Sequence, residues 1–253
     1  NNTEGPTLAA HAITNAVQRA GIDPAEIEDV VMGCAMPQGT TGYNVGRMSA
    51  LASGLGVGVA GMTVDRQCAS GMMAIATAVK QVLHDGMEVV VGGGLESISL
   101  VQNEHSNSFR GQDPTVLSHA EHAYMGMLDT AETVAKRYGI SREEMDHFGV
   151  QSQARTAAAQ AANLFTDEIV PMTVTKLLVN KETGETAEQQ VTIEQDEGNR
   201  PGTTYADLER IRTVYEGGTI AAGNASQLSD GASASIIMSS ELAEKRGLNP
   251  LGA

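Results

Sequence analysis

The chain has 253 residues, of which 41% are hydrophobic and 3% aromatic, enough apolar material for one large domain or two modest ones. Its formal net charge of −15 and isoelectric point near 4.7 argue against binding to nucleic acid or to an anionic membrane surface. The two cysteines have no metal-type spacing, and no apolar run approaches the ~20 residues of a membrane span. We therefore expect a cytoplasmic protein of layered α/β type, in a reducing compartment and without disulfides.

The first part of the chain alternates between helical and strand-like patterns. Apolar residues recur at helical spacing from Thr7 to Ala20, and Gly21 follows at a position typical of a helix end. A short helix opened by Asp23 comes next. It is followed by a buried strand at residues 29–34, a glycine-rich loop at 37–46 and a helix at 45–53. The first residues contain neither an initiator methionine nor a signal peptide, so we expect a processed chain or one that begins part-way through a gene product.

A strand-like run from Met62 to Gln67 ends at Cys68, and a helical pattern follows to about Leu83. This order predicts a sharp turn with Cys68 at the start of a helix, where unpaired N–H groups and the helix dipole favour a thiolate. The thiolate is the reactive form of cysteine. Cys68 is therefore a candidate nucleophile, and the alternative is a small packed residue, as most free cysteines are.

The next apolar run, from Glu88 to Gly93, predicts another strand of the same sheet. Its continuous valines are typical of a strand covered on both faces, so the alternation up to Ser97 indicates parallel βαβ units. Cys34, in the earlier strand, is expected to be an inert packed residue. His84 lies about 24 Å along the helix from Cys68, because each residue adds about 1.5 Å, and cannot be that thiol's base.

The pattern changes at residue 100. Residues 100–123 are polar and irregular and predict a long surface loop, a kind of segment that is usually functional or disordered. Two helices are then expected, one at 128–138 and one that starts with a Ser141–Glu144 capping box and ends at about 162. A β-hairpin follows, which pairs residues 169–178 with 187–194. The last expected elements are a helix at 203–214 and a strand at 232–238. We expect residues 100–213 to form an inserted, mostly helical subdomain.

Two details of this region make testable expectations. On the longer helix, the small and apolar face is expected to run from Phe148 through Gln151 and Ala154. The loop histidines His119 and His122 have a spacing that suits a metal on a helix, but no carboxylate or cysteine completes a convincing set. We expect them to be solvated, and we expect no metal site.

Four blocks of sequence occur in the order found in one known family. They are Asp65-Arg-Gln-Cys-Ala-Ser-Gly71; Gly92-Gly-Gly-Leu-Glu-Ser97; Met125-Gly126 with Thr130-Ala-Glu132; and Ala222-Gly-Asn-Ala-Ser226 with Ser229-Asp-Gly-Ala232. Together they closely resemble the thiolases, the acyl-CoA acyltransferases that make and break 3-oxoacyl-CoA. The resemblance implies the αβαβα layered α/β fold, with residues 1–99 and 214–253 as its N-terminal half and 100–213 as the loop subdomain that holds CoA. We count four strands where the family has five.

The resemblance also implies a reaction. Cys68 would attack a 3-oxoacyl-CoA or acetyl-CoA and carry the acyl group, with its own N–H as one oxyanion donor. CoA and acyl-CoA would be substrates, so no cofactor is expected, and the members of the family form homodimers or homotetramers through the strand edge near the nucleophile.

Substrate contacts follow from the same resemblance. Met125 would lie against the acyl group, and Ala222 and Ser226 would line the pantetheine and acyl channel. Arg200 would lie near the nucleotide phosphates, with a solvated surface arginine as the alternative. Nearby, Asn224 and Asp230 are expected to tie the last loop together through Asx hydrogen bonds.

Some family features are absent from these residues. Thiolases carry an Asn-Glu-Ala-Phe block, a Gly-His-Pro block and a second reactive cysteine, which supply the base and part of the oxyanion hole, and none occurs here. We therefore expect the 253 residues alone to lack turnover. Two alternatives stay open. One is a ketosynthase-like condensing enzyme, although ketosynthases favour a serine-rich sequence just after the nucleophile. The other is a non-catalytic CoA-binding or assembly module.

Overall fold

The computed structural model describes residues 2–252, which form two compact units. Unit 1 comprises the residues up to 106, residues 170–194 and the residues from 229 onward; unit 2 comprises residues 107–169 and 195–228. The β-hairpin expected from the sequence groups with unit 1 by its contacts, whereas the expected insertion of 100–213 included it. The role of residues 100–213 as a CoA-binding subdomain stays a prediction.

A four-stranded sheet forms the centre of unit 1, in the order β2-β1-β3-β6. Its strands are β1 (Asp29–Gly33), β2 (Ala60–Val64), β3 (Val89–Glu96) and β6 (Gly231–Met238). β1 pairs in parallel with both β2 and β3, and β6 runs antiparallel to β3. The predicted parallel βαβ units are thus confirmed, and the carboxyl ends of β1, β2 and β3 meet at one edge of the sheet.

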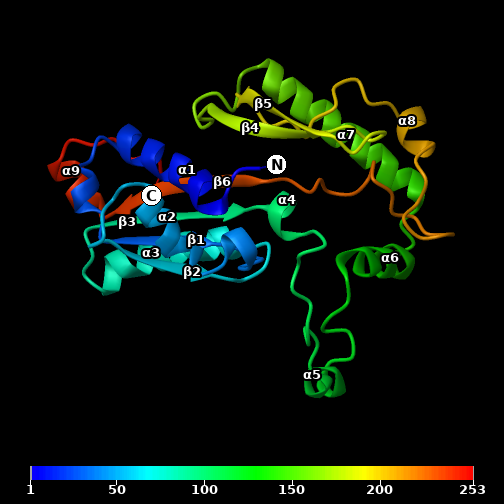
Figure 1. Cartoon of the computed structure of the whole chain (residues 1–253), viewed down its shortest axis with the longest axis horizontal. Helices are drawn as coiled ribbons and strands as arrows, with labels where there is room; N and C mark the ends of the chain where they lie inside the picture. The colour runs from blue at the N-terminus through cyan, green and yellow to red at the C-terminus, as the bar shows by residue number, and fades with distance from the viewer. Residues whose placement is uncertain (1, 253) are drawn as a thin grey trace. The chain divides into compact units, whose positions relative to one another are not determined.

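Helices cover both faces of this sheet (Figure 1). On one face, Val30 and Met32 of β1 pack with the helices α1 (Gly5–Ala20) and α2 (Val45–Ala52). On the other, Val31 packs with α3 (Ser70–His84). Successive residues of a strand point to opposite faces, so a continuous run of valines buries itself on both.

Unit 1 also contains shorter elements and one separate hairpin. The short helices are η1 (Pro24–Glu26), η2 (Gly39–Thr41), α4 (Ile98–Val101) and α9 (Ser240–Lys245). The predicted hairpin is confirmed as β4 (Met172–Val179) and β5 (Thr186–Ile193), which pair antiparallel around the turn that begins at Asn180.

Unit 2 is mostly helical, with α5 (Pro114–His119), α6 (Met127–Tyr138), α7 (Arg142–Ala161) and α8 (Tyr205–Glu209). Figure 1 shows α5 within the loop that connects α4 to α6. The capping box predicted at Ser141 and Glu144 is confirmed at the start of α7. The helix predicted at 203–214 is shorter than expected, because Arg210 caps it and the chain then turns.

The expected apolar face of α7 is wrong. Phe148, Gln151 and Ala154 are exposed, and the fully buried residue of this helix is Asp146. The residue that α7 buries is thus a carboxylate and not an apolar side chain. Because buried polar groups are almost always hydrogen-bonded, Asp146 is expected to have polar partners.

Across residues 2–252, no helix is both long and apolar enough to cross a bilayer. Within the same range, no three His, Cys, Asp or Glu side chains lie together as a metal site would require. His119 and His122 are both exposed.

Candidate active site

Cys68 lies in the turn between β2 and α3, and it is exposed. The strand ends at Val64 and the helix begins at Ser70, so Cys68 precedes the helix cap, Ala69, by one residue. The predicted order of strand, turn and helix is therefore confirmed, with the helix starting two residues later than expected. The thiol stands ahead of the first helical turn, where the helix dipole favours negative charge.

Side-chain hydrogen bonds hold this turn in one conformation. Ser70, which is buried, accepts a hydrogen bond from the Arg66 N–H at 2.8 Å and donates to the Gln67 carbonyl at 2.5 Å. The Asp65 carboxylate accepts from the Gln67 N–H at 2.9 Å. Gln67 itself has φ +49°, a left-handed conformation that is uncommon for a residue other than glycine. A strained, well-bonded turn directly before a nucleophile fixes the backbone that carries it.

Two glycines let the helix come close to the ends of the strands. A Cβ on Gly33, the last residue of β1, would lie 2.2 Å from the Ser70 carbonyl carbon. A Cβ on Gly94 of β3 would lie 3.3 Å from the Gly71 Cα. The start of α3 therefore packs directly on the backbone of the sheet, and Ser70 and Gly33 are site-forming residues that the sequence patterns did not single out.

Cys34, unlike Cys68, is buried. It is 1% exposed, and its Sγ donates to the Glu96 carboxylate at 3.5 Å. Burial, followed by the nearby negative charge of Glu96, raises the pKa of Cys34 to about 11. The thiol is therefore protonated at neutral pH, which agrees with its expected role as a packed residue.

The loop of residues 217–226 presents two of the expected contact residues to solvent. Ala222 and Ser226 are exposed, whereas Ala221 is fully buried. Asn224 ties the loop together as expected, because its Oδ1 accepts from the Ala221 N–H at 2.9 Å. Asp230 makes a different bond, since its Oδ1 accepts from the distant Ser99 N–H at 2.9 Å and fastens the start of β6 to α4.

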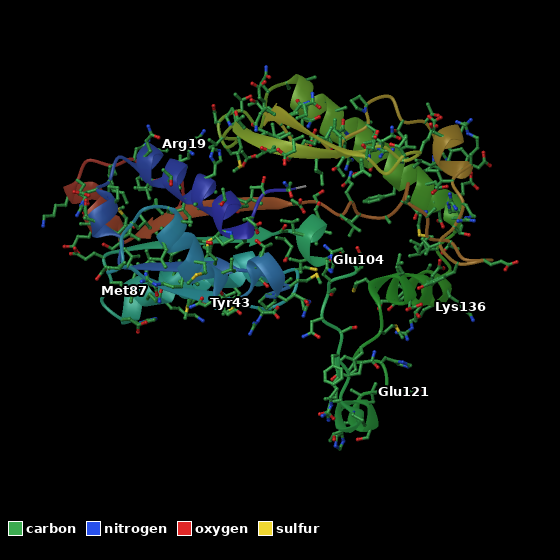
Figure 2. All side chains as sticks on the ribbon, viewed as in Figure 1. Arg19, Tyr43, Met87, Glu104, Glu121 and Lys136 are labelled. Atoms are coloured by element: carbon green, nitrogen blue, oxygen red, sulfur yellow. The ribbon has the colours of Figure 1, made fainter. Side chains whose placement is uncertain are left out.

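Met125 and Arg200 lie elsewhere in unit 2. Met125 is partly exposed and lines a shallow hollow of about 310 Å³ together with Gln112, Leu117, Glu121, His122, Tyr124 and Asp129. Glu121, labelled in Figure 2, lies just beyond α5. Arg200 is exposed, and its backbone N–H donates to Gln153 Oε1 at 2.8 Å, which fixes the chain there and leaves the side chain at the surface.

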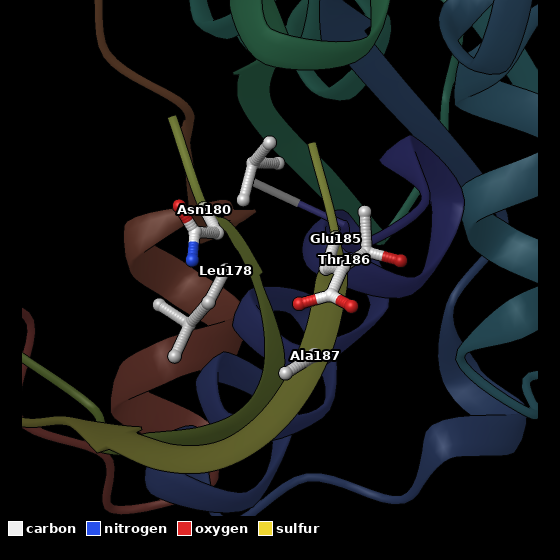
Figure 3. A pocket seen from close by; sticks show the side chains of 6 residues that line it. Leu178, Asn180, Glu185, Thr186 and Ala187 are labelled. Carbon is white, nitrogen blue, oxygen red and sulfur yellow. The ribbon is translucent and has the colours of Figure 1, made fainter. Parts of the chain in front are cut away.

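A larger hollow, of about 680 Å³, lies at the turn end of the hairpin in unit 1. Figure 3 shows Leu178 of β4, Thr186 and Ala187 of β5, and Asn180 and Glu185 at the two ends of the turn between these strands. Among its six lining residues there is no thiol, imidazole or amine. The hollow includes none of the expected site residues.

The expected site residues are thus divided between the two units. Cys68 belongs to unit 1, and Met125, Arg200, Ala222 and Ser226 belong to unit 2. The structure places the nucleophile at the end of the sheet and two of the contact residues on one exposed loop. Their approach to a common substrate stays a prediction.

Comparisons with known proteins identify similar chains. Residues 1–241 match the family model described as thiolase, N-terminal domain. The chain is 38% identical over 245 residues to a 3-ketoacyl-CoA thiolase of Bacillus subtilis, covering 96% of this chain and 62% of that protein. It is 34% identical over 262 residues to an acetyl-CoA acetyltransferase of Rhizobium meliloti, covering 99% of this chain and 63% of the relative.

A solved structure agrees with these matches. The crystal structure of the Bacillus anthracis acetyl-CoA acetyltransferase has a TM-score of 0.79 and 33% identity, covering 99% of this chain and 63% of that one. The chain thus spans somewhat less than two thirds of the length of these similar proteins.

Proposed function

The chain belongs to the thiolase family, and on that basis we propose that it acts in acyl transfer between CoA thioesters through an acyl group carried on Cys68. The observation that carries the proposal is the exposed Cys68 thiol, held ahead of α3 by the bonded turn at Gln67 and Ser70. An accessible thiol on a fixed backbone turn beside a helix start suits nucleophilic catalysis. The names of the relatives favour this activity over the ketosynthase-like and non-catalytic alternatives.

The proposed reaction has two steps. In thiolysis, the Cys68 thiolate attacks the keto carbon of a 3-oxoacyl-CoA, and the bond between its α and β carbons breaks. The released acetyl-CoA carbanion takes up a proton, and the shortened acyl group stays on Sγ. A CoA thiolate then attacks the acyl carbonyl and releases acyl-CoA and free Cys68. Run in reverse from acetyl-CoA, the same steps form a carbon–carbon bond.

Residues of unit 2 would hold the substrate. We assign the acyl group to Met125, the pantetheine arm to Ala222 and Ser226, and the phosphates to Arg200. The exposure of Ala222, Ser226 and Arg200 supports this assignment, because a side chain must be accessible to bind CoA. The Cys68 N–H would be one donor to the oxyanion.

Three further properties belong to the proposal. The chemistry needs no cofactor, because the thiol itself carries the acyl group. We propose a homodimer or homotetramer, which the edge position of β2 in the sheet supports, since an edge strand offers unpaired backbone groups to a second copy. We also propose a cytoplasmic location, supported by the two free cysteines.

Intact-mass analysis after incubation with acetyl-CoA tests the proposed function. We expect the mass of one acetyl group to be added, and peptide mapping to place it on Cys68. The variant Cys68→Ala should gain nothing, and Cys34→Ala should be acetylated like the unaltered protein. An unmodified Cys68 would contradict the proposal and favour a CoA-binding module.

A further inference from the structure

A carboxylate of α6 holds the start of the loop at residues 217–226. Glu132 Oε1 accepts hydrogen bonds from the Thr219 and Ile220 N–H groups, both at 2.8 Å. Its Oε2 accepts from the Thr219 hydroxyl at 2.7 Å and from the Thr219 N–H at 3.0 Å. Both oxygens of one side chain are thus used to fix two consecutive residues of the loop.

A second carboxylate holds the middle of the same loop. Asp146 of α7 is fully buried, and its Oδ1 accepts from the Asn224 side-chain amide at 2.9 Å. Its Oδ2 accepts from Arg142 Nε at 2.7 Å, and the Arg142 guanidinium donates onward to the Leu208 carbonyl at 2.8 Å. Asn224 in turn binds the Thr219 carbonyl at 3.1 Å. The loop, α7 and α8 are therefore joined in one network.

Glycines make room for these bonds. A Cβ on Gly218 would lie 2.6 Å from Glu132 Oε1, and one on Gly223 would lie 2.6 Å from Leu208 Cδ2. A Cβ on Gly149 of α7 would lie 2.8 Å from the Gly223 carbonyl oxygen. The loop backbone thus rests directly on the helices.

The hydrogen-bond donors keep Glu132 ionised. The Ile220 N–H first, and then the Thr219 donors, hold the pKa of Glu132 below its usual range, against the opposing effect of burial. A carboxylate accepts these bonds more strongly than a neutral amide would.

The bonded residues face the helices, while Ala222 and Ser226 on the same loop are exposed. We propose that Glu132 and Asp146 are positioning residues, which fix the loop so that Ala222 and Ser226 meet the pantetheine arm of CoA. This inference rests on the proposed function. Neither carboxylate touches the substrate, and each acts through the loop that it holds.

The variant Glu132→Gln tests this role. A glutamine retains the shape, but its amide places N–H donors where the loop also presents N–H donors, so the loop shifts. We expect the acetyl-CoA concentration that gives half the maximal rate of Cys68 acetylation to rise about tenfold, with the maximal rate itself changed less than about twofold. Alkylation of Cys68 by iodoacetamide, which requires no CoA, should proceed at the unaltered rate. Hydrogen exchange at the Thr219 and Ile220 amides should accelerate.

A milder variant and a control complete the test. Thr219→Val removes one of the donors to Glu132 and should raise the half-saturating acetyl-CoA concentration for Cys68 acetylation by about threefold. Glu143→Gln removes the same charge from an exposed position of α7, where the carboxylate lies 3.8 Å from His147, and should leave that half-saturating concentration unchanged.

If Cys68 of Glu132→Gln is acetylated with an unchanged half-saturating acetyl-CoA concentration, the positioning role alone is overturned. A parallel fall in the alkylation rate would also overturn it, because the damage would then extend to the nucleophile. Failure of the unaltered protein to be acetylated would instead overturn the proposed function and the inference that rests on it.

Discussion

The two units of the molecule are held together in different ways. Unit 1 buries an apolar cluster between its sheet and helices, including Ala9, Ile13, Val17, Val30, Met32, Val45, Val89 and Val91. Among the described residues of unit 2, which span 107–169 and 195–228, the buried ones are Ala135, Asp146, Leu208, Ile220 and Ala221. Unit 2 also contains a set of hydrogen bonds to Glu132, Asp146 and Asn224 that joins its helices to the loop of residues 217–226.

This difference has a physical consequence. Apolar burial is non-directional and is distributed over many side chains, so the core of unit 1 does not depend on the orientation of any single polar group. A polar network depends on direction, and the removal of one acceptor leaves several donors without a partner. Unit 1 is thus suited to carry a fixed nucleophile at Cys68, whereas unit 2 is suited to set the geometry of a loop.

The largest loss of stability is expected where unit 1 has no room for a side chain, at the contact of Gly33 with the start of α3. The variant Gly33→Val adds atoms where even a Cβ would lie 2.2 Å from the Ser70 carbonyl carbon, and backbone cannot move aside as a side chain can. We expect the free energy of unfolding to fall by about 3 kcal/mol or more. Urea denaturation measures it, and hydrogen exchange should show the loss in the β1 and β3 amides.

The matched control is Gly71→Ala, on the other side of the same contact. A Cβ there meets no atom within 4 Å, and alanine favours a helix more than glycine does. We expect this protein to be as stable as the unaltered one or slightly more so. Equal losses in the two variants would show that close approach does not explain the requirement for glycine.

A smaller effect is expected in unit 2 from Asp146→Ala. The variant leaves Asn224 and Arg142 without their shared acceptor, but Arg142 is 22% exposed and can be partly solvated. We expect a loss of about 2 kcal/mol. Faster hydrogen exchange should be confined to unit 2. The exposed Glu143→Ala, on the same helix, should change stability by less than about 0.5 kcal/mol.

The contrast between the units also explains what could be predicted from sequence. The strands at 29–34 and 88–93 were predictable because continuous valines leave few other structures, and the Ser141–Glu144 capping box was predictable because its residues are three apart. Cys68 was placed in its turn by the break between two periodic patterns.

Long-range polar contacts left no such local signal. Asp146 occupies a helix position that is usually solvated, and its partner Asn224 lies 78 residues further along the chain. A three-residue spacing therefore favoured the wrong face of α7, with Phe148 inward. The need for glycine at position 33 also left no signal in the sequence. Gly33 must make room for the Ser70 backbone, and that contact is set by the tertiary fold.

The smallest predicted effect is a pH dependence of stability that comes from Cys34, a thiol in the apolar core of unit 1. Cys34 has its pKa raised from 9.0 to about 11, so above pH 9 the unfolded chain loses this proton while the folded one retains it. Stability contributed by the neutral thiol is therefore complete below pH 9 and is lost as pH rises towards 11.

We expect the stability difference between the unaltered protein and Cys34→Ala to shrink by about 1 kcal/mol between pH 8 and pH 10. Denaturant unfolding at each pH measures it. A difference that stays constant would mean that Cys34 is not shielded in the folded state. Water would then reach the core of unit 1 at the end of β1. At that point unit 1 would not be the dry apolar core that distinguishes it from the polar network of unit 2.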